Sequence, residues 1–424
     1  MTAKNFIKKF TPKPLISLYH FKLSFLGALK YGFPSRKLEV IGVTGTSGKS
    51  TTVNLISNIL EEAGIAVAST SSIRFRINGK DRPNLLKMTM PGRWKIQSFL
   101  REAANAGCKI AVVEVTSEGI VQHRHRFINF KMALFNNLAL EHIESHGSFE
   151  NYRKAKEKLF QTVKGIHILN LDDDNVEHFL KYPAEKKYGY TIKGKIVEGV
   201  QAISAKDIKS VAGGSEFEVD GMKIYLPLQG DFNVCNALAA ICVGTAKGID
   251  LSTMKKALEK TATVPGHMDE IMSEPFSIFV DYAFIPSTLE KVQQTLKAKA
   301  VARGGRLIGV LGSCGGGRDK WKRPVLGEIA KKYCDEIIIT NEDPYDEDPQ
   351  EIIDQVAKGA GDKAIKILDR REAISQALKL AKPEDVVILT GKGCEPWICV
   401  ADGKKVAWDE KKVALEEYQK LISR

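Results

Sequence analysis

The sequence predicts an α/β protein built on mainly parallel sheets, and three observations lead to that prediction. From Leu38 onward, short apolar runs alternate with segments of helical periodicity, as in βαβ units. The first run, Leu38–Val43, continues through a glycine-punctuated loop into a helical pattern. Near Pro265-Gly266 the alternation starts again, which predicts a second, doubly wound unit of about 160 residues.

This pattern divides the chain into three segments. We expect a basic, largely apolar helical segment at 1–37, a central domain at 38–264 and a C-terminal domain at 265–424. A chain of 424 residues is long enough for about two or three cores.

Charge and cysteine content narrow the class of protein. The formal net charge is +12, and residues 1–40 carry +7 of it, since they hold eight basic side chains and one acid. The rest of the chain shows no basic stripe with interleaved aromatics, so we expect phosphorylated substrates and no nucleic acid. The seven cysteines form no C-x-x-C pair, and no signal peptide is visible. These features predict a cytoplasmic protein.

The N-terminal segment contains one predicted helix, between Pro14 and Gly32. Its polar or small side chains form a narrow stripe on an otherwise apolar helix: Ser17, His20, Ser24, Gly27 and Tyr31. Lys22 and Lys30 interrupt the apolar side, which argues against a membrane span. Two interpretations compete. The helix is a clasp packed on the central domain with both lysines reaching solvent, which the short link after Pro34 favours, or it makes a peripheral membrane contact.

A phosphate-binding loop is predicted directly after the first strand. Gly45 and Gly48 allow backbone N–H groups to approach an anion, and the following helix adds its positive dipole end. Lys49 would reach the β- and γ-phosphates, and the Ser50 hydroxyl would bind Mg²⁺. The first glycine of the strict motif falls on Val43, so an ordinary βα turn is the alternative. The strand–loop–helix context favours a nucleoside triphosphate site.

Two further strand ends carry residues that suit a metal ion. The buried run Ile110–Val115 holds one acid, Glu114, near its end, where the ligand crevice of an open α/β sheet lies. Glu114 is placed to hold Mg²⁺, with capping of the next helix as the alternative. Beyond the strand at Met132–Asn137 come His142 and His146, two of only eight histidines. Their place after a strand end favours a role at the same crevice.

The rest of the chain adds helices, short strands and polar loops. The helix at Tyr152–Phe160 carries lysines at 154, 156 and 158, and a solvated charged face is the plain interpretation. Residues 190–230 predict a small antiparallel excursion. The strands predicted for the second unit are Ile278–Asp281, Arg306–Leu311, Glu336–Thr340, Ile365–Ile367 and Val386–Thr390.

Taken in order, these landmarks resemble the Mur ligase family, ATP-dependent amide-forming enzymes of peptidoglycan synthesis. Within the family, the chain is most similar to the UDP-N-acetylmuramoyl-tripeptide synthetases. The resemblance runs from about Leu38 to the C-terminus, and its blocks are TGTSGKSTT (44–52), EVTSEGIVQHR (114–124), NNLALEHIESHG (136–147), YRKAKEKLF (152–160), GDFNVCNALAA (230–240), PGHMD (265–269), VDYAFIPSTLEK (280–291), GGGRDKWKRPVLGEIA (315–330), NEDPYDEDP (341–349) and GKGCE (391–395). The resemblance implies a P-loop ATPase-like central domain and a Rossmann-like C-terminal domain.

The resemblance also implies the catalytic and nucleotide-binding residues. The catalytic set would be Lys49, Glu114, His142 and Lys156. ATP would be bound by Gly45, Thr46, Ser47, Gly48, Lys49, Ser50, Thr51, Asn137, Asn233, His267, Asp281 and Lys320. Two Mg²⁺ ions would be held by Ser50, Glu114, His142 and Lys156. Lys156 matches a lysine that the family carbamylates with CO₂, which turns a cation into an oxygen ligand of the right sign.

The substrate-binding residues follow from the same matches. Thr89, Thr116, Gln122 and Arg124 would lie near the acceptor carboxylate. The incoming amino acid would contact Arg323, Asp343, Tyr345, Gly391 and Glu395.

Several positions depart from the family pattern. Thr116 stands for a serine, Glu118 for a histidine, Glu141 for an aspartate, His267 for an arginine and Phe284 for a histidine. Glu342-Asp343-Pro344-Tyr345 replaces D-N-P-R, whose arginine grips diaminopimelate in the family. Only residues 1–37 stand where the family has its UDP-binding domain. The nucleotide chemistry is therefore expected to be intact, whereas the identity of the acceptor does not follow from the resemblance.

The function implied is an ADP-forming ligase that adds an amino acid to a carboxylate through an acyl phosphate. The expected acceptor is a small molecule or a UDP-linked muramoyl-peptide. The alternatives are a ligase acting on a folate or poly-γ-glutamate, a nucleotide-binding scaffold without ligase activity, or a P-loop NTPase acting on nucleic acid. The last is disfavoured because the chain has no arginine-rich, helicase-like blocks.

Overall fold

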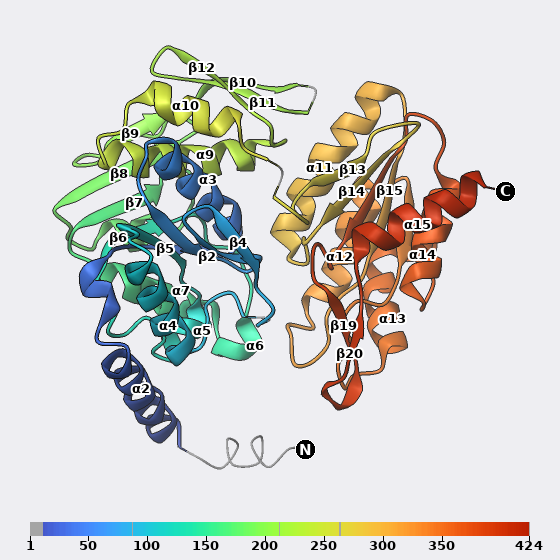
Figure 1. Cartoon of the computed structure of the whole chain (residues 1–424). Helices are drawn as coiled ribbons and strands as arrows, with labels where there is room; N and C mark the ends of the chain where they lie inside the picture. Colours follow the sequence, from blue (N-terminus) through green and yellow to red (C-terminus); the bar gives the residue numbers. More distant parts are fainter. Residues whose placement is uncertain (1–11, 87, 212, 263, 424) are drawn as a thin grey trace. The chain divides into compact units, whose positions relative to one another are not determined.

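The computed structural model describes residues 12–86, 88–211, 213–262 and 264–423, which form two compact units (Figure 1). The first unit contains the described residues up to Ala139, then Phe149–Pro227 and Asp231–Thr261. The second contains Leu140–Ser148, Leu228–Gly230 and the described residues from Ala262 onward. The part of the predicted N-terminal segment before Pro12 lies outside the described residues.

A large, mainly parallel sheet forms the centre of the first unit. The described strands have the order β4-β3-β2-β5-β1-β6-β7-β8-β9. Their bounds are β1 Glu39–Thr44, β2 Val67–Thr70, β3 Arg74–Ile77, β4 Lys80–Pro83, β5 Ile110–Glu114, β6 Phe130–Phe135, β7 Ile166–Asn170, β8 Lys186–Thr191 and β9 Gln201–Ser204. Only the pairings of β2 with β3 and of β3 with β4 are antiparallel. Since β1 pairs in parallel with β5 and β6, the residues that follow these three strands emerge at one edge of the sheet.

Helices cover both faces of this sheet. They are α2 Lys13–Lys30, α3 Lys49–Glu62, α4 Arg93–Asn105, α5 Ser117–Val121, α7 Phe149–Thr162, α8 Glu177–Leu180, α9 Asp231–Ala246 and α10 Leu251–Glu259, with a 3₁₀ turn at Pro34–Lys37. Apolar side chains of α4, α5 and α7 share one core with alternate residues of the central strands. Strands β10 Lys206–Val211, β11 Gly214–Val219 and β12 Met222–Leu226 form a separate antiparallel sheet, which confirms the excursion predicted at 190–230.

Helix α2 packs against α4 within the first unit. Its polar stripe faces the protein: Ser24 is buried, and the hydroxyls of Ser17 and Ser24 bond to His123. Its large apolar side chains are exposed, an orientation that the sequence pattern alone did not specify. The hydroxyls bond to the backbone oxygen and the imidazole of His123, polar groups that an apolar face would leave unsatisfied. Among the described residues, none of the helices combines the length and the apolarity that crossing a membrane demands.

The second unit is built on a six-stranded sheet of order β13-β14-β18-β15-β16-β17 among the described residues. Its strands are β13 Asp269–Met272, β14 Ser277–Asp281, β15 Leu307–Leu311, β16 Glu336–Ile339, β17 Ala364–Lys366 and β18 Val386–Thr390, with a hairpin of β19 Trp397–Cys399 and β20 Lys405–Ala407. Its helices are α6 Ile143–His146, α11 Pro286–Arg303, α12 Lys322–Tyr333, α13 Pro349–Ala360, α14 Arg370–Leu380 and α15 Glu410–Ile422, with 3₁₀ turns at Gly361–Lys363 and Ala401–Gly403. Every pairing in the six-stranded sheet is parallel except that of β13 with β14.

The predicted fold class is confirmed, and the five strands predicted for the second unit are present within one or two residues. The sequence pattern did not reveal the antiparallel edge β3–β4 or the β19–β20 hairpin. These are strands of three or four residues, and β4 and β20 are exposed throughout, so they lack the apolar alternation that marks a strand.

Candidate active site

The loop between β1 and α3 is shaped by close packing. Gly48 precedes α3 with φ of 78°, a left-handed conformation that favours glycine. A Cβ on Gly45 would lie 2.8 Å from that of Asn136, so only a bare backbone fits there. The side-chain oxygen of Asn137 accepts hydrogen bonds from the two backbone N–H groups that follow Gly45, at 3.1 and 2.9 Å. Asn137, a predicted nucleotide residue, therefore holds the loop itself.

Two lysine amino groups meet at one carbonyl oxygen of this loop. Lys49 Nζ donates to the Gly45 oxygen at 2.9 Å, and Lys156 Nζ, from α7, donates to the same oxygen at 2.7 Å. Lys156 is 2% exposed, so the plain interpretation of a solvated charged face fits Lys154 and is wrong for Lys156. Burial, and next the charge of Lys49, lower the pKa of Lys156 well below its ordinary value. A negative group beside this pair would relieve the repulsion.

Glu114 ends β5 and is joined to the start of α3. The carboxylate is fully buried, and its Oε1 accepts from the Ser50 hydroxyl at 2.6 Å and from the Ser72 backbone at 3.1 Å. Ser72 also donates to the Thr89 hydroxyl at 2.8 Å. Burial raises the pKa of Glu114, and the nearby charge of Lys49 opposes that shift. A buried carboxylate beside a hydroxyl is the oxygen donor set that a hard divalent cation prefers, so these residues fit Mg²⁺.

His142 belongs to the second unit, where it precedes α6 with φ of 57°. The Asp319 carboxylate accepts from the next two backbone N–H groups, at 3.1 and 2.9 Å. Glu141 and Lys322 form a buried ion pair with 3.0 Å between Oε1 and Nζ. These contacts hold the segment that carries His142. Across the described ranges, no three His, Cys, Asp or Glu side chains gather as a metal site; the predicted set contains only two residues of these types.

The predicted acceptor-side residues form a second polar network in the first unit. Thr116 caps α5, where its hydroxyl accepts from Gly119 N at 3.0 Å. Arg124 donates to the Gln122 side-chain oxygen at 2.8 Å. Arg93 donates to the backbone oxygen of Gln122 at 3.1 Å. The structure thus brings Gln122 and Arg124 together directly after α5.

In the second unit, a buried lysine gathers two predicted substrate residues. Lys392 is 0% exposed and lies 2.9 Å from an Asp343 oxygen and 2.7 Å from a Glu395 oxygen. The Tyr282 hydroxyl donates to Glu395 at 3.1 Å. A Cβ on Gly391, whose φ is 101°, would lie 2.3 Å from a Glu342 oxygen. Asp343, Gly391 and Glu395 therefore share one buried polar cluster.

The other predicted residues of the second unit contact different partners. Asp281 accepts from the backbones of Met268 and Ala283, both at 2.6 Å, and burial raises its pKa to about 7. Lys320 and Arg323 both pair with Glu347, at 3.1 and 3.0 Å.

Tyr345, His267 and Asn233 are three more of the predicted residues. Tyr345 has a φ of 52° and packs against Gly316. His267 lies 6.2 Å from the Tyr282 ring, centroid to centroid. Asn233 belongs to the first unit and accepts from Asn236 at 3.2 Å.

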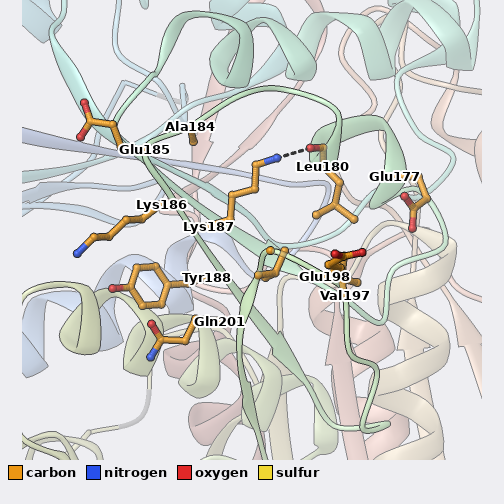
Figure 2. A pocket seen from close by; sticks show the side chains of 12 residues that line it. Glu177, Leu180, Ala184, Glu185, Lys186, Lys187, Tyr188, Val197, Glu198 and Gln201 are labelled. Atoms are coloured by element: carbon orange, nitrogen blue, oxygen red, sulfur yellow. Dashed lines mark hydrogen bonds between the residues drawn. The ribbon is translucent and has the colours of Figure 1, made fainter.

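A surface pocket of about 630 Å³ lies elsewhere in the first unit, between α8 and the strands β8 and β9 (Figure 2). Lysine and glutamate side chains surround it, and Lys187 is held by a hydrogen bond of 2.6 Å to the Leu180 oxygen. None of the predicted site residues lines it. We assign it no role in the reaction.

Sequence reasoning missed several residues that organise the site. Lys392 stands inside the block GKGCE, and Ser72 and Asn136 touch Glu114 and the loop. Lys392 carried the clearest signal of the three, because it stands between two glycines directly after a buried strand. Ser72 has no such signal, since only the β2–β3 turn brings it to Glu114.

Comparisons with known proteins identify the family of the chain. The Mur ligase middle domain matches residues 43–244, and the Mur ligase glutamate ligase domain matches residues 268–393. A UDP-N-acetylmuramoyl-L-alanyl-D-glutamate–2,6-diaminopimelate ligase of Clostridium tetani is 36% identical over 92% of this chain and 80% of its own. A UDP-N-acetylmuramyl-tripeptide synthetase of Roseiflexus is also 36% identical, with the same coverage.

Solved structures give the same result. A UDP-N-acetylmuramoyl-L-alanyl-D-glutamate–2,6-diaminopimelate ligase aligns with a TM-score of 0.59 and 28% identity, covering 91% of this chain and 79% of its own. A Mycobacterium tuberculosis folylpolyglutamate synthase aligns with a TM-score of 0.72 at 18% identity, over 87% of this chain and 92% of its own, which shows the fold alone.

The fold and the phosphate loop define a class of ATP-dependent ligases built from a P-loop domain and a Rossmann-like domain. The chain belongs to the Mur ligase family. It is an ADP-forming ligase of the Mur type, and its relatives are named as a diaminopimelate ligase and a tripeptide synthetase.

Proposed function

We propose that the chain adds an amino acid to the peptide carboxylate of a UDP-muramoyl-peptide in peptidoglycan synthesis. The arrangement of Lys49, Ser50, Glu114 and Lys156 around the loop carries this proposal, because it suits transfer of the γ-phosphoryl group to a carboxylate. The names of the Clostridium tetani and Roseiflexus relatives support the acceptor class.

The reaction has two steps. A carboxylate oxygen of the acceptor attacks the γ-phosphorus, and the bond to the bridging oxygen breaks, so that an acyl phosphate and ADP form. The amine of the incoming amino acid then attacks the acyl carbon, phosphate leaves, and the amide forms with loss of a proton. Lys49 and the loop backbone offset the charge that moves onto the bridging oxygen. Gln122 and Arg124 hold the acceptor carboxylate through their paired side chains.

Two magnesium sites belong to this proposal. Ser50 and Glu114 would hold one ion, and Glu114, His142 and a carbamate on Lys156 would hold the other. Bound Mg²⁺ would offset negative charge on the phosphoryl and carboxylate oxygens. The observation in support is the buried Glu114 carboxylate, whose burial disfavours its charge unless a cation joins it.

The lowered pKa of the Lys156 amine supports the proposed carbamate. A neutral amine attacks CO₂, an N–C bond forms, and one proton is released, so the side chain changes from neutral to negative. The charge of Lys49, which opposes an ammonium at this place, then favours the carbamate. The Lys156 amine already lies in a site that is closed to bulk water.

The second unit would bind the incoming amino acid. The amino-acid site would be lined by Asp343, Gly391 and Glu395, which lie around Lys392. Arg323 and Tyr345 would be its further contacts. Asn233, His267, Asp281 and Lys320 would complete the contacts with ATP.

We also propose the domain division 1–37, 38–264 and 265–424. The first family match ends before residue 264 and the second begins after it, which supports this boundary.

The test is an amino-acid panel with ATP and UDP-muramoyl dipeptide, read by mass spectrometry of the product. A mass increase by one amino acid minus water, with matching phosphate release, is the expected result. Pteroyl-glutamate serves as the second acceptor, and elongation of that molecule alone would replace the proposal by the folate alternative. Phosphate release that needs neither acceptor would favour a scaffold.

A further inference from the structure

Helix α2 exposes its apolar side and buries its polar side. In Figure 1 it projects from the first unit at the N-terminal end of the described chain. Six large side chains on its outer sides are between 41% and 59% exposed: Leu15, Leu18, Tyr19, Phe25, Leu26 and Leu29. Leu15 lies three and four residues before Leu18 and Tyr19, and Leu29 lies four and three residues after Phe25 and Leu26, so the two trios share the exposed side of the helix, with Lys22 between them. An exposed contiguous face of this kind marks a surface that binds a partner.

The inner side of α2 is firmly attached. The Ser17 hydroxyl lies 2.7 Å from His123 Nε2, and the Ser24 hydroxyl donates to the His123 backbone oxygen at 2.8 Å. Ala28 is 0% exposed, and a Cβ on Gly27 would lie 3.3 Å from the Arg93 oxygen at the start of α4. The helix is therefore not free to turn its leucines inward, and its apolar face stays outside.

The charge around this face has one sign. Between Pro12 and Leu38 the chain holds no Asp or Glu, while the exposed side chains of Lys22, Lys30, Arg36 and Lys37 are all basic. Lys22 lies on the apolar face itself, one turn from Leu18 and from Leu26. The Lys30 amine sits 5.1 Å from the ring of Trp94, which is 39% exposed. Leucine, aromatic and lysine side chains together are the mixture found where a helix meets lipid headgroups.

We propose that α2 docks this protein on an anionic lipid surface, with the leucine face in the acyl boundary and the lysines at the phosphates. A second copy of the chain is disfavoured as the occupant, because symmetric pairing of this face would bring its uncompensated basic residues together. Docking parallel to the surface agrees with the attachment of the inner side, since a helix held along its length by the protein cannot turn to cross a bilayer. The lysine stems are long enough to lie along apolar surface and deliver charge to the headgroups.

The experiment is vesicle flotation with the full chain, using phosphatidylcholine vesicles with and without phosphatidylglycerol, at low and high salt. We expect flotation only with the anionic vesicles, weakened by salt. The variant Leu15→Ser/Leu26→Ser/Leu29→Ser should lower the affinity at least about tenfold, since it removes three apolar side chains from the docking face. These positions are 57%, 46% and 54% exposed, so folding should tolerate the change.

The matched control changes three apolar residues elsewhere that are more than half exposed. Ile196→Ser/Val301→Ser/Val406→Ser, at 84%, 62% and 52% exposure, should float like the parent. Absence of flotation with anionic vesicles, or equal flotation of the two variants, would overturn the proposal. A dimer in sedimentation velocity that only the α2 variant loses, without flotation, would assign the face to a second copy. Flotation is read without turnover, so its failure leaves the proposed ligase function untouched.

Discussion

At the scale of single residues, the two amino groups at the Gly45 oxygen are the most informative feature of the site. Lys49 and Lys156 both donate to this oxygen, and two positive charges so close together would repel each other. A P-loop lysine is expected to meet phosphate. Burial and the charge of Lys49 both disfavour the protonated form of Lys156. A neutral amine can react with CO₂, which favours a covalent change at Lys156.

We expect Lys156→Ala to lose at least about 100-fold in turnover, because one charge-bearing group at the reacting phosphoryl is gone. Acetate or formate should restore part of the rate by refilling the space with an oxygen donor. Steady-state kinetics with and without these acids is the measurement. Lys154→Ala, on the same helix and 62% exposed, is the control and should keep the parent rate. Full activity of the parent in CO₂-depleted buffer would contradict the carbamate.

Asp281 should make the stability of the protein depend on pH. Its pKa is raised to about 7 by burial, from 3.8, so the folded state binds more protons than the unfolded state between these values. The free energy of unfolding should therefore fall as the pH rises through this window, once the other groups are subtracted. Asp281→Asn removes this contribution and should flatten the decline, as measured by urea unfolding at several pH values. Asp402→Asn, at a 79% exposed aspartate, should leave the decline unchanged; identical profiles for both variants would refute the assignment.

Tyr345 should set the choice of amino acid. It stands where the family has the arginine that grips diaminopimelate, and loss of a bidentate charged pair costs roughly 3 kcal/mol, or about 100-fold in discrimination. We expect weak preference for diaminopimelate in competition with lysine, and a gain of at least about tenfold in Tyr345→Arg. Product masses from a mixture of both amino acids give the ratio. A strong preference of the parent for diaminopimelate would show that another group holds its distal carboxylate.

At the scale of elements, a buried ion pair joins the C-terminal helices. Arg370 of α14 and Glu410 of α15 are 1% and 0% exposed in their side chains, with 2.5 Å between the charged atoms. Arg370 also donates to the backbone oxygens of Asn341 and Thr390. The pair therefore ties two helices to the loops that follow β16 and β18, where the candidate amino-acid residues begin.

Breaking this pair should be costly. Arg370→Met should lower the free energy of unfolding by roughly 3–5 kcal/mol, because Glu410 keeps a buried charge without its partner. The double variant Arg370→Met/Glu410→Met should lose less than the single one. Arg371→Met is the neighbouring control: its side chain is 39% exposed, and its pairs with glutamates should be worth less than about 1 kcal/mol. Equal losses for Arg370→Met and Arg371→Met in urea unfolding would disprove the account.

At the scale of the whole molecule, two units divide the chemistry. The loop, Glu114 and Lys156 lie in the first unit, whereas His142, Asp281 and the Lys392 cluster lie in the second. The segment Leu140–Ser148 is covalently continuous with the first unit and belongs by its contacts to the second. A single sequence block, NNLALEHIESHG, therefore supplies residues to both units.

Turnover should require both units and both substrates. ADP formation by the parent should rise at least about tenfold when acceptor and amino acid are both present, since the acyl phosphate forms only on a bound carboxylate. Lys49→Ala should lower this stimulated rate by about 100-fold or more. A coupled ADP assay is the measurement, and Lys195→Ala, an exposed lysine, is the control. ADP formation that no acceptor changes would contradict a ligase.

The sequence alone determined those features of the fold that depend on local patterns of residues. Buried runs such as Val40–Val43 and Ile110–Val113, the loop at Gly45 and Gly48, and the restart after Pro265 each depend on neighbours in the chain, so periodicity and turn chemistry reveal them. The resemblance then supplied roles for residues such as Lys156 that pattern alone assigns to a solvated surface.

Only the tertiary structure decided which groups meet and which sides are covered. The approach of Lys156 to the Gly45 oxygen joins residues 111 positions apart, and the shift of its pKa comes from burial, which no local pattern records. The same holds for Lys392 between Asp343 and Glu395, and for Ser72 beside Glu114. Helix α2 is the clearest case. Its composition is visible in the sequence, but the side that faces the protein was decided by polar partners at His123 that lie 99 and 106 residues further along the chain.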